Sequence, residues 1–169
     1  MYSIEPLPCP SEFIDMWNAA GNHLNSNIQE TGARWLRADL PAFREHLSFT
    51  LGNQLFFIQV LNIDGGEQSW VNLKLLAKVA KEANGIACVM PMRKLDGIWR
   101  PTENSWGLVD IASDLPVFPE KLQSAHPVII SDWEVHDIGI QLVRDYLKDE
   151  EYEIQSWQSD IRVNPSISC

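Results

Sequence analysis

The order of periodic hydrophobic segments limits the fold of this chain more than any other feature. Ser11 can cap a helix, and apolar residues then recur at helical spacing opposite several polar side chains. These apolar residues are Phe13, Met16, Trp17, Ala20 and Leu24. Two runs rich in Phe, Leu, Ile and Val follow over 47–51 and 55–62, and Gly52-Asn53 between them indicates a β-hairpin.

Residues 72–84 return to the helical period, with Leu, Val and Ala on one side and lysines on the other. Gly85 is expected to cap this helix at its C-terminal end. A short apolar strand over 86–90 follows, and Asp96-Gly97 predicts a turn. Further extended pieces are expected at Trp99 and over 106–111.

The last third of the chain starts with a segment that lacks periodicity. Residues 114–127 include three prolines and predict a linker or a surface crossing. Ser131 and Glu134 have the spacing of a capping box, and a helix is expected from about 132 to 149. Apolar residues fill more than half of its circumference, which indicates burial on two sides. A strand ending near Trp157 is the last element that we recognise.

These segments predict an α/β or α+β fold, with a small mixed or antiparallel sheet flanked by helices and a C-terminal helix–strand unit. We divide the chain into an α/β body over 1–112, a Pro-rich crossing over 113–127 and the C-terminal unit over 128–169. The length of 169 residues suits one domain, so we expect the unit to pack on the body.

Charge is distributed unevenly along this acidic chain, whose formal net charge is −10. Nine basic and twelve acidic residues precede residue 113, and four basic and eleven acidic residues follow. This balance opposes nucleic-acid binding, because phosphate contacts draw on Lys and Arg. The stretch from Lys74 to Arg100 is locally basic. It is either a solvated surface or a surface that the acidic C-terminal unit of another copy meets.

The start of the chain has neither the basic region nor the apolar core of a secretion signal. No apolar run approaches the roughly 18 residues of a membrane span. Cys9, Cys88 and Cys169 are an odd count at wide spacing, which fits reduced thiols rather than a disulfide framework or a zinc site. We therefore expect a cytoplasmic chain with no membrane partner, cofactor or metal.

Two groups of residues carry alternative functional interpretations. Asp132, Glu134 and His136 could form a metal or hydrolase site, although the capping box and the helix dipole already explain the two acids. Cys88 lies in an apolar run, which favours a buried thiol over a nucleophile.

The chain has seven tryptophans, which is more than its composition predicts. Their side chains either complete a core or form a protein-binding surface. The residues of this candidate surface are Trp99, Arg100, Trp106, Trp133, Leu142 and Tyr146.

Five pieces of the chain stand out together: Ala87-Cys88-Val89-Met90-Pro91-Met92-Arg93, Trp99-Arg100-Pro101, Trp106-Gly107-Leu108-Val109-Asp110, Gln155-Ser156-Trp157-Gln158-Ser159-Asp160 and Asn164-Pro165-Ser166-Ile167. They resemble an uncharacterised bacterial protein family, which implies a cytosolic bacterial protein and no particular activity. The order helix, hairpin, helix, strand is also similar to the restriction-endonuclease-like core. Gln59-Val60-Leu61 stands where that pattern needs Glu-x-Lys, so this resemblance implies a catalytically silent version.

Taken together, the sequence predicts a non-enzymatic interaction protein that self-associates. A degenerate or unrecognised metal-dependent hydrolase of the nuclease type, with its site near Asp132, is the alternative. A sensor that holds a small molecule in an aromatic pocket is a third interpretation, because pockets are not visible in a sequence.

Overall fold

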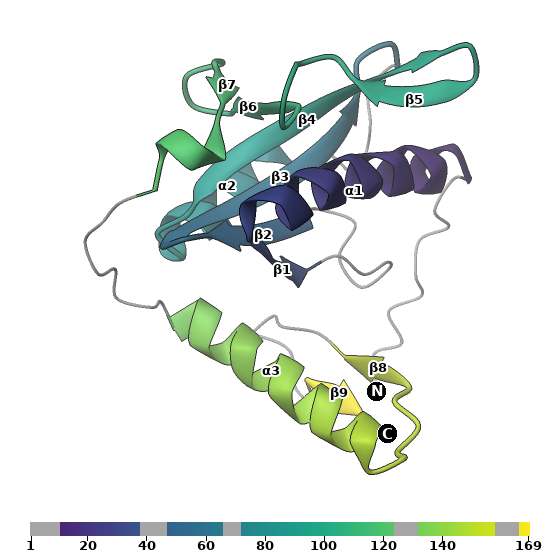
Figure 1. Ribbon diagram of the computed structural model, residues 1–169, viewed down its shortest axis with the longest axis vertical. Helices are drawn as coiled ribbons and strands as arrows, with labels where there is room; N and C mark the ends of the chain where they lie inside the picture. The colour runs from purple at the N-terminus through teal and green to yellow at the C-terminus, as the bar shows by residue number, and fades with distance from the viewer. Residues whose placement is uncertain (1–10, 38–46, 66–71, 124–131, 158–165) are drawn as a thin grey trace.

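A computed structural model describes residues 11–37, 47–65, 72–123, 132–157 and 166–169 (Figure 1). Its elements are α1 (Ser11–Thr31), β1 (Arg34–Arg37), β2 (Leu47–Leu51), β3 (Gln54–Asn62), α2 (Leu73–Glu82), β4 (Ile86–Leu95), β5 (Ile98–Pro101), β6 (Leu108–Asp110), β7 (Pro116–Val117), the 3-10 helix η1 (Pro119–Lys121), α3 (Asp132–Asp149), β8 (Ser156–Trp157) and β9 (Ile167–Ser168). The described residues include no helix long and apolar enough to cross a membrane.

A mixed sheet of seven strands forms the centre of the fold. Its strands lie in the order β1-β2-β3-β4-β6-β7, and β5 pairs with β4 beside this path. Strands β3 and β4 are parallel and are joined by α2, whereas the other described pairs are antiparallel. The predicted α+β class, with a C-terminal helix and strand unit, is confirmed.

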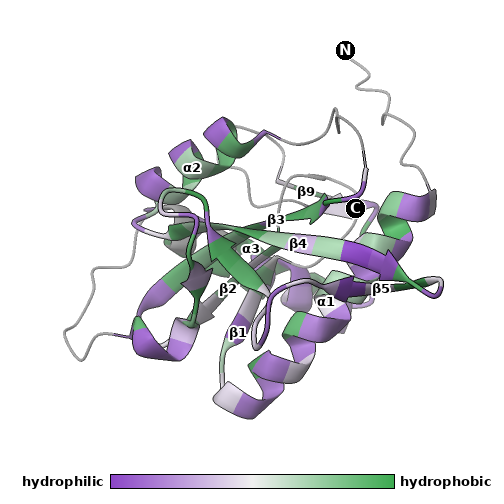
Figure 2. Ribbon diagram, turned by 90° about the horizontal axis from the view of Figure 1, so that it is seen from above, coloured by the Kyte–Doolittle hydropathy of each residue, from purple (hydrophilic) through white to green (hydrophobic). Residues whose placement is uncertain are grey.

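The two faces of the sheet are covered by different helices, with α1 on one side and α2 on the other (Figure 2). Strand β3 serves both faces because side chains alternate along a strand. Phe56, Ile58 and Val60 join the cluster under α1, while Leu55 and Phe57 join the cluster under α2. All five apolar residues predicted for the inner face of the first helix are buried, and Ile28 extends that face by one more turn.

The hairpin prediction is confirmed, since Leu51 pairs with Gln54 across a turn of two residues. The cap expected at the end of α2 is wrong in its details. Asn84, and not Gly85, takes the left-handed conformation, with φ of 54°. The amides of Asn84 and Gly85 donate to the carbonyls of Lys81 and Ala80, which is a Schellman motif. Gly85 is needed because a Cβ there would lie 2.8 Å from the Phe57 ring.

The Pro-rich segment begins as part of the sheet. Val117 in β7 pairs with Leu108 in β6, and both Val117 and Pro119 are buried. The first residues of the crossing that we expect over 113–127 therefore belong to the sheet, and its last four residues, 124–127, lie outside the described residues.

The C-terminal unit consists of α3 and the short hairpin of β8 and β9, and it lies below β1 in Figure 1. Helix α3 has the predicted bounds, whereas the sequence gives no sign of β9. Ser131 and the Glu134 side chain lie outside the described residues, so the capping box stays a prediction. Gln141 Nε2 of α3 donates a hydrogen bond of 3.0 Å to the Leu36 carbonyl of β1.

Candidate functional site

Helix α3 packs on the rest of the chain with one side. The Arg144 guanidinium lies 4.5 Å from the centre of the Trp157 ring in β8, a cation–π contact. Ile140 and Leu147 on the same side are half-buried, and Gln141 reaches β1. These contacts fix which side of α3 turns toward solvent.

The opposite side of α3 exposes a stripe of large apolar side chains. Val135, Ile138, Leu142 and Tyr146 are 57%, 38%, 66% and 62% exposed. Spacings of three and four residues place all four on one face of the helix. We call these four residues the α3 face. The predicted burial on two sides is therefore wrong for a single copy, because the α3 face is open to solvent.

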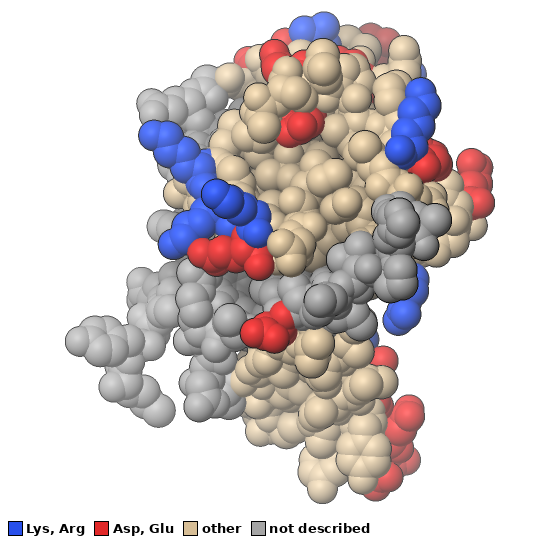
Figure 3. Space-filling view, turned by 90° about the vertical axis from the view of Figure 1, so that its left-hand side faces the viewer, with Lys and Arg blue, Asp and Glu red and all other residues tan. Residues whose placement is uncertain are grey.

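The surroundings of the α3 face are acidic. Asp145 and Asp149 are exposed next to it, and the whole helix has five acidic and two basic residues. Figure 3 shows a largely uncharged surface on the lower part of the molecule, with acidic side chains along its edge. Gly139 lies within this part of the helix, and a Cβ there would meet nothing within 4 Å.

A second exposed apolar group lies at the other end of the molecule, on the ribbon of β4 and β5. Leu95 pairs directly with Ile98, and Arg93 pairs with Arg100 two residues further along. Residues two apart point to the same side of a strand, so all four side chains share one face. Leu95 and Ile98 are 51% and 56% exposed. We call these four residues the ribbon face.

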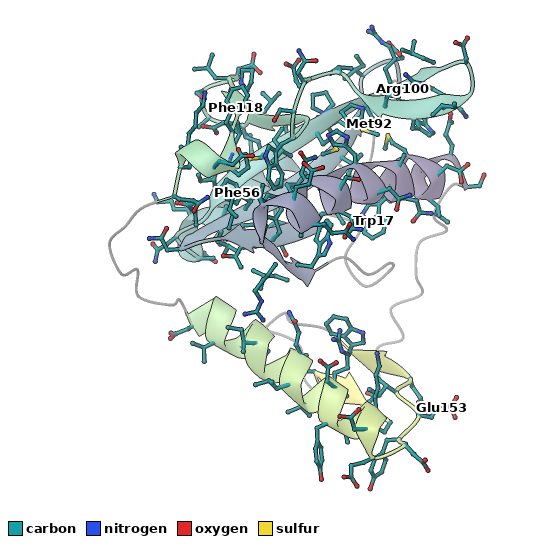
Figure 4. The ribbon with its side chains drawn as sticks, viewed as in Figure 1. Trp17, Phe56, Met92, Arg100, Phe118 and Glu153 are labelled. Carbon is teal, nitrogen blue, oxygen red and sulfur yellow. The ribbon has the colours of Figure 1, made fainter. Side chains whose placement is uncertain are left out.

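The charges of the ribbon face are basic. Arg93 Nε lies 3.0 Å from Asp64 Oδ2, whereas Arg100 has no ion pair within the described residues. Figure 4 shows Arg100 on β5, far from α3. Sequence reasoning named Arg100 but missed Leu95 and Ile98. The Asp96-Gly97 turn was the signal for them, because a turn of two residues places its flanking residues opposite each other.

Two members of the predicted interaction surface belong to the core instead. Trp106 is fully buried, and Trp99 is buried on the side of the ribbon that faces α1. Neither ring can contact a partner, so these two assignments are wrong. Leu142, Tyr146 and Arg100 are exposed, so their place in an interaction surface stays a prediction, whereas the Trp133 side chain lies outside the described residues. Within one copy, β5 with Arg100 lies far from α3 (Figure 4).

The residues of the alternative metal or hydrolase site do not form a ligand cluster. Asp132 is exposed, and His136 is half-buried with its Nε2 atom unpaired in this part of the structure. The Glu134 side chain and His126 are not described. No group of three or more His, Cys, Asp or Glu side chains that could hold a metal occurs among the described residues.

Gln59 occupies the position at which the nuclease pattern needs an acid. Its side chain is buried, and its Oε1 atom accepts a hydrogen bond of 3.3 Å from the Asn72 amide. Asn72 in turn caps α2, since its side chain accepts from the Leu75 amide. The Gln59 amide therefore positions the start of α2 against β3.

Cys88 is fully buried in the cluster under α1. Burial raises the pKa of its thiol, and the nearby Asp110 carboxylate raises that pKa further. The nucleophilic thiolate is thus suppressed over the whole physiological pH range. The sequence-based choice of a buried thiol over a catalytic one agrees with this environment.

This burial sets the expected thiol reactivity. In a Cys9→Ser variant, Ellman's reagent at pH 8 is expected to modify the exposed Cys169 quickly and Cys88 only after unfolding. Thiol release in buffer and in denaturant measures the difference. Modification of both thiols at equal rates in the native protein would contradict the buried position.

The comparison with protein families finds one match. Residues 133–169 match a family described as a domain of unknown function (DUF8840). The matched part includes α3, β8 and β9, and it contains the whole α3 face. This match fits the resemblance of the chain to an uncharacterised family. None of the comparisons supports the resemblance to the restriction-endonuclease-like core. No curated protein and no solved structure matches the chain.

Proposed function

We propose that this chain is a non-enzymatic protein-interaction module that binds a second copy of itself. The α3 face of one copy packs on the ribbon face of the next. The observation that carries the proposal is the α3 face, where four large apolar side chains lie exposed on one helix. Contiguous apolar patches of this kind mark interaction sites on soluble proteins, whereas scattered exposed residues do not.

Charge favours the ribbon face as the docking partner. Asp145 is ion-paired with Arg144 at 2.7 Å, but two α3 faces packed together would bring Asp149 of both copies close to each other, and like charges oppose such a contact. The ribbon face offers two apolar side chains beside Arg93 and Arg100. An apolar centre with opposite charges at its rim is the usual composition of a specific interface.

The positions of the two faces favour two copies over one. In Figure 1 the ribbon lies at one end of the molecule and α3 at the other. One copy therefore cannot pack its own α3 face on its own ribbon face in this arrangement. Contact between two different faces is head-to-tail, and it produces a closed ring or an open chain.

Sedimentation velocity over a wide range of protein concentration tests the proposal. We expect the weight-average sedimentation coefficient to rise with concentration as rings or short chains form. A coefficient of a monomer at every concentration would refute self-association.

Charge reversal tests the orientation of the contact. Arg100→Glu is expected to weaken self-association about tenfold, since a rim charge pair contributes about 1 kcal/mol and its reversal adds repulsion. Asp149→Arg in the same chain is expected to restore part of the loss. Lys121→Glu, an equal charge change at an exposed position of η1, is the control and is expected to leave the assembly unchanged. Equal weakening by Lys121→Glu would indicate a net-charge effect instead of a contact.

The alternative hydrolase function has less support. It requires a set of acidic or histidine ligands around a metal and water. Asp132 and His136 are the described members of that set, and the half-buried His136 ring turns one nitrogen away from solvent. We therefore give the α3 face priority over a metal site.

A further inference from the structure

A groove where α1 meets β1 and the start of β2 is independent of the proposed interaction. It is lined by Trp17, Trp35 and Leu47, by three asparagines and by Gly21, and its volume is about 200 Å³. Trp17 lies on α1 and is labelled in Figure 4. The asparagines are Asn18, Asn22 and Asn25. Among the described residues, no charged side chain lines the groove.

The amide groups in this groove are available to a ligand. Asn25 Oδ1 accepts a hydrogen bond of 3.1 Å from Trp35 Nε1, which leaves the amide NH₂ of Asn25 free to donate. The side-chain amides of Asn18 and Asn22 have no hydrogen bond to any of the described residues, and both side chains are exposed. Each of these two amides offers donors and an acceptor side by side.

Gly21 provides a second observation. Glycine inside a helix costs about 1 kcal/mol relative to alanine, so a packing or functional reason is expected for it. Packing supplies none, because a Cβ at Gly21 would meet nothing within 4 Å. Gly21 lies on the same helix face as Asn18, Asn22 and Asn25. Its missing side chain keeps the space between the three amides open.

We propose that this groove binds one ring of a neutral pyranose sugar. A sugar ring carries hydroxyl groups that both donate and accept, which matches the amides, and an apolar C–H face that packs on the half-buried indole of Trp35. The described lining residues carry no charge and therefore offer an ionic ligand no ion pair. The volume suits a single ring, because pockets for larger drug-sized ligands start near 300 Å³.

The orientation of Trp35 agrees with this role. Its ring meets Phe49 edge-on, with centroids 6.4 Å apart and planes at 81°. Its N–H is fixed on Asn25, so the indole is held in place before a ligand binds. Groups that are fixed in advance bind with a smaller loss of entropy.

NMR titration of the full ¹⁵N-labelled chain tests the proposal with N-acetylglucosamine, glucose and galactose, and with adenosine as a neutral ligand that is not a free sugar. We expect saturable shifts of the Asn22 amide and the Trp35 indole N–H with at least one sugar. The expected dissociation constant is of the order of 1 mM, as for a small polar ligand with few contacts. Absence of saturable shifts with all three sugars would overturn the proposal, as would tighter binding of adenosine.

Two variants connect these shifts to the groove. Gly21→Leu fills the open space, and Asn22→Asp adds a charge without a change of size. Each variant is expected to raise the dissociation constant of the sugar about tenfold or more. A tenfold increase is the effect of losing one hydrogen bond. The melting temperature is expected to stay the same or to rise for Gly21→Leu, because leucine is the better helix former. Glu30→Leu, at an exposed position of α1 outside the groove, is the control. Unchanged binding in both groove variants would place the sugar elsewhere.

Discussion

Replacing both Leu142 and Tyr146 with serine is expected to weaken self-association by about 10²- to 10³-fold. These side chains are the two most exposed members of the α3 face. A buried leucine contributes about 2 kcal/mol to an interface, and tyrosine is among the residues that most often dominate binding. A loss of about 3 to 4 kcal/mol corresponds to the stated change in affinity. Sedimentation equilibrium of the variant and the parent chain measures it.

The same variant separates an interface from a core. Serine at an exposed position changes the stability of the monomer little, so the urea midpoint is expected to stay within experimental error. Leu115→Ser is the matched control, because Leu115 is 62% exposed on the body and belongs to neither face. A lower urea midpoint with intact assembly would place Leu142 and Tyr146 in the core.

Trp106→Ala is expected to lower the free energy of unfolding by about 3 to 5 kcal/mol. The ring is fully buried and stacks on Phe49 with centroids 5.0 Å apart and planes at 15°. Its Nε1 atom also donates a hydrogen bond of 2.6 Å to Glu120 Oε1, which connects η1 to the core. Truncation leaves a cavity and removes the hydrogen bond together. Denaturation in urea, followed by circular dichroism, measures the loss.

Trp157→Ala is the control for this prediction. Trp157 is half-buried and contacts Arg144 in the C-terminal unit, away from the main core. Its removal is expected to cost about 1 kcal/mol, as for one cation–π contact with partial burial. Equal losses for the two tryptophans would contradict the assignment of Trp106 to the core and of Trp157 to a peripheral contact.

Much of the fold could be predicted because its elements have clear hydrophobic periods. Helix α1, the hairpin of β2 and β3, and α3 follow directly from such patterns. The second half of β4 is different, since Arg93 and Lys94 interrupt the apolar run. That part of the strand forms a hairpin with β5, and the sequence marks it by the Asp96-Gly97 turn and not by a hydrophobic period. The two residues of β7 are too few for a period.

The residues of the candidate interaction surface divide in the same way. The exposed Leu142 and Tyr146 could be named because a wide apolar arc on a helix is visible in the sequence. The burial of Trp99 and Trp106 was not visible, because it depends on β4 being paired with both β5 and β6. The groove beside Gly21 could not be predicted either. It exists only because β1 brings Trp35 next to Asn25 from ten residues further along the chain.

The hydrogen bond from Gln141 to Leu36 has a consequence for solubility. Strand β1 ends the sheet on one side, and an edge strand with free carbonyls is a template for aggregation. The Gln141 amide occupies one such carbonyl, so α3 blocks the addition of a foreign strand at that edge. At the opposite edge β7 is only two residues long and contains Pro116, which cannot donate a ladder hydrogen bond. The two ends of the strand order β1-β2-β3-β4-β6-β7 are thus poor templates for amyloid-like growth.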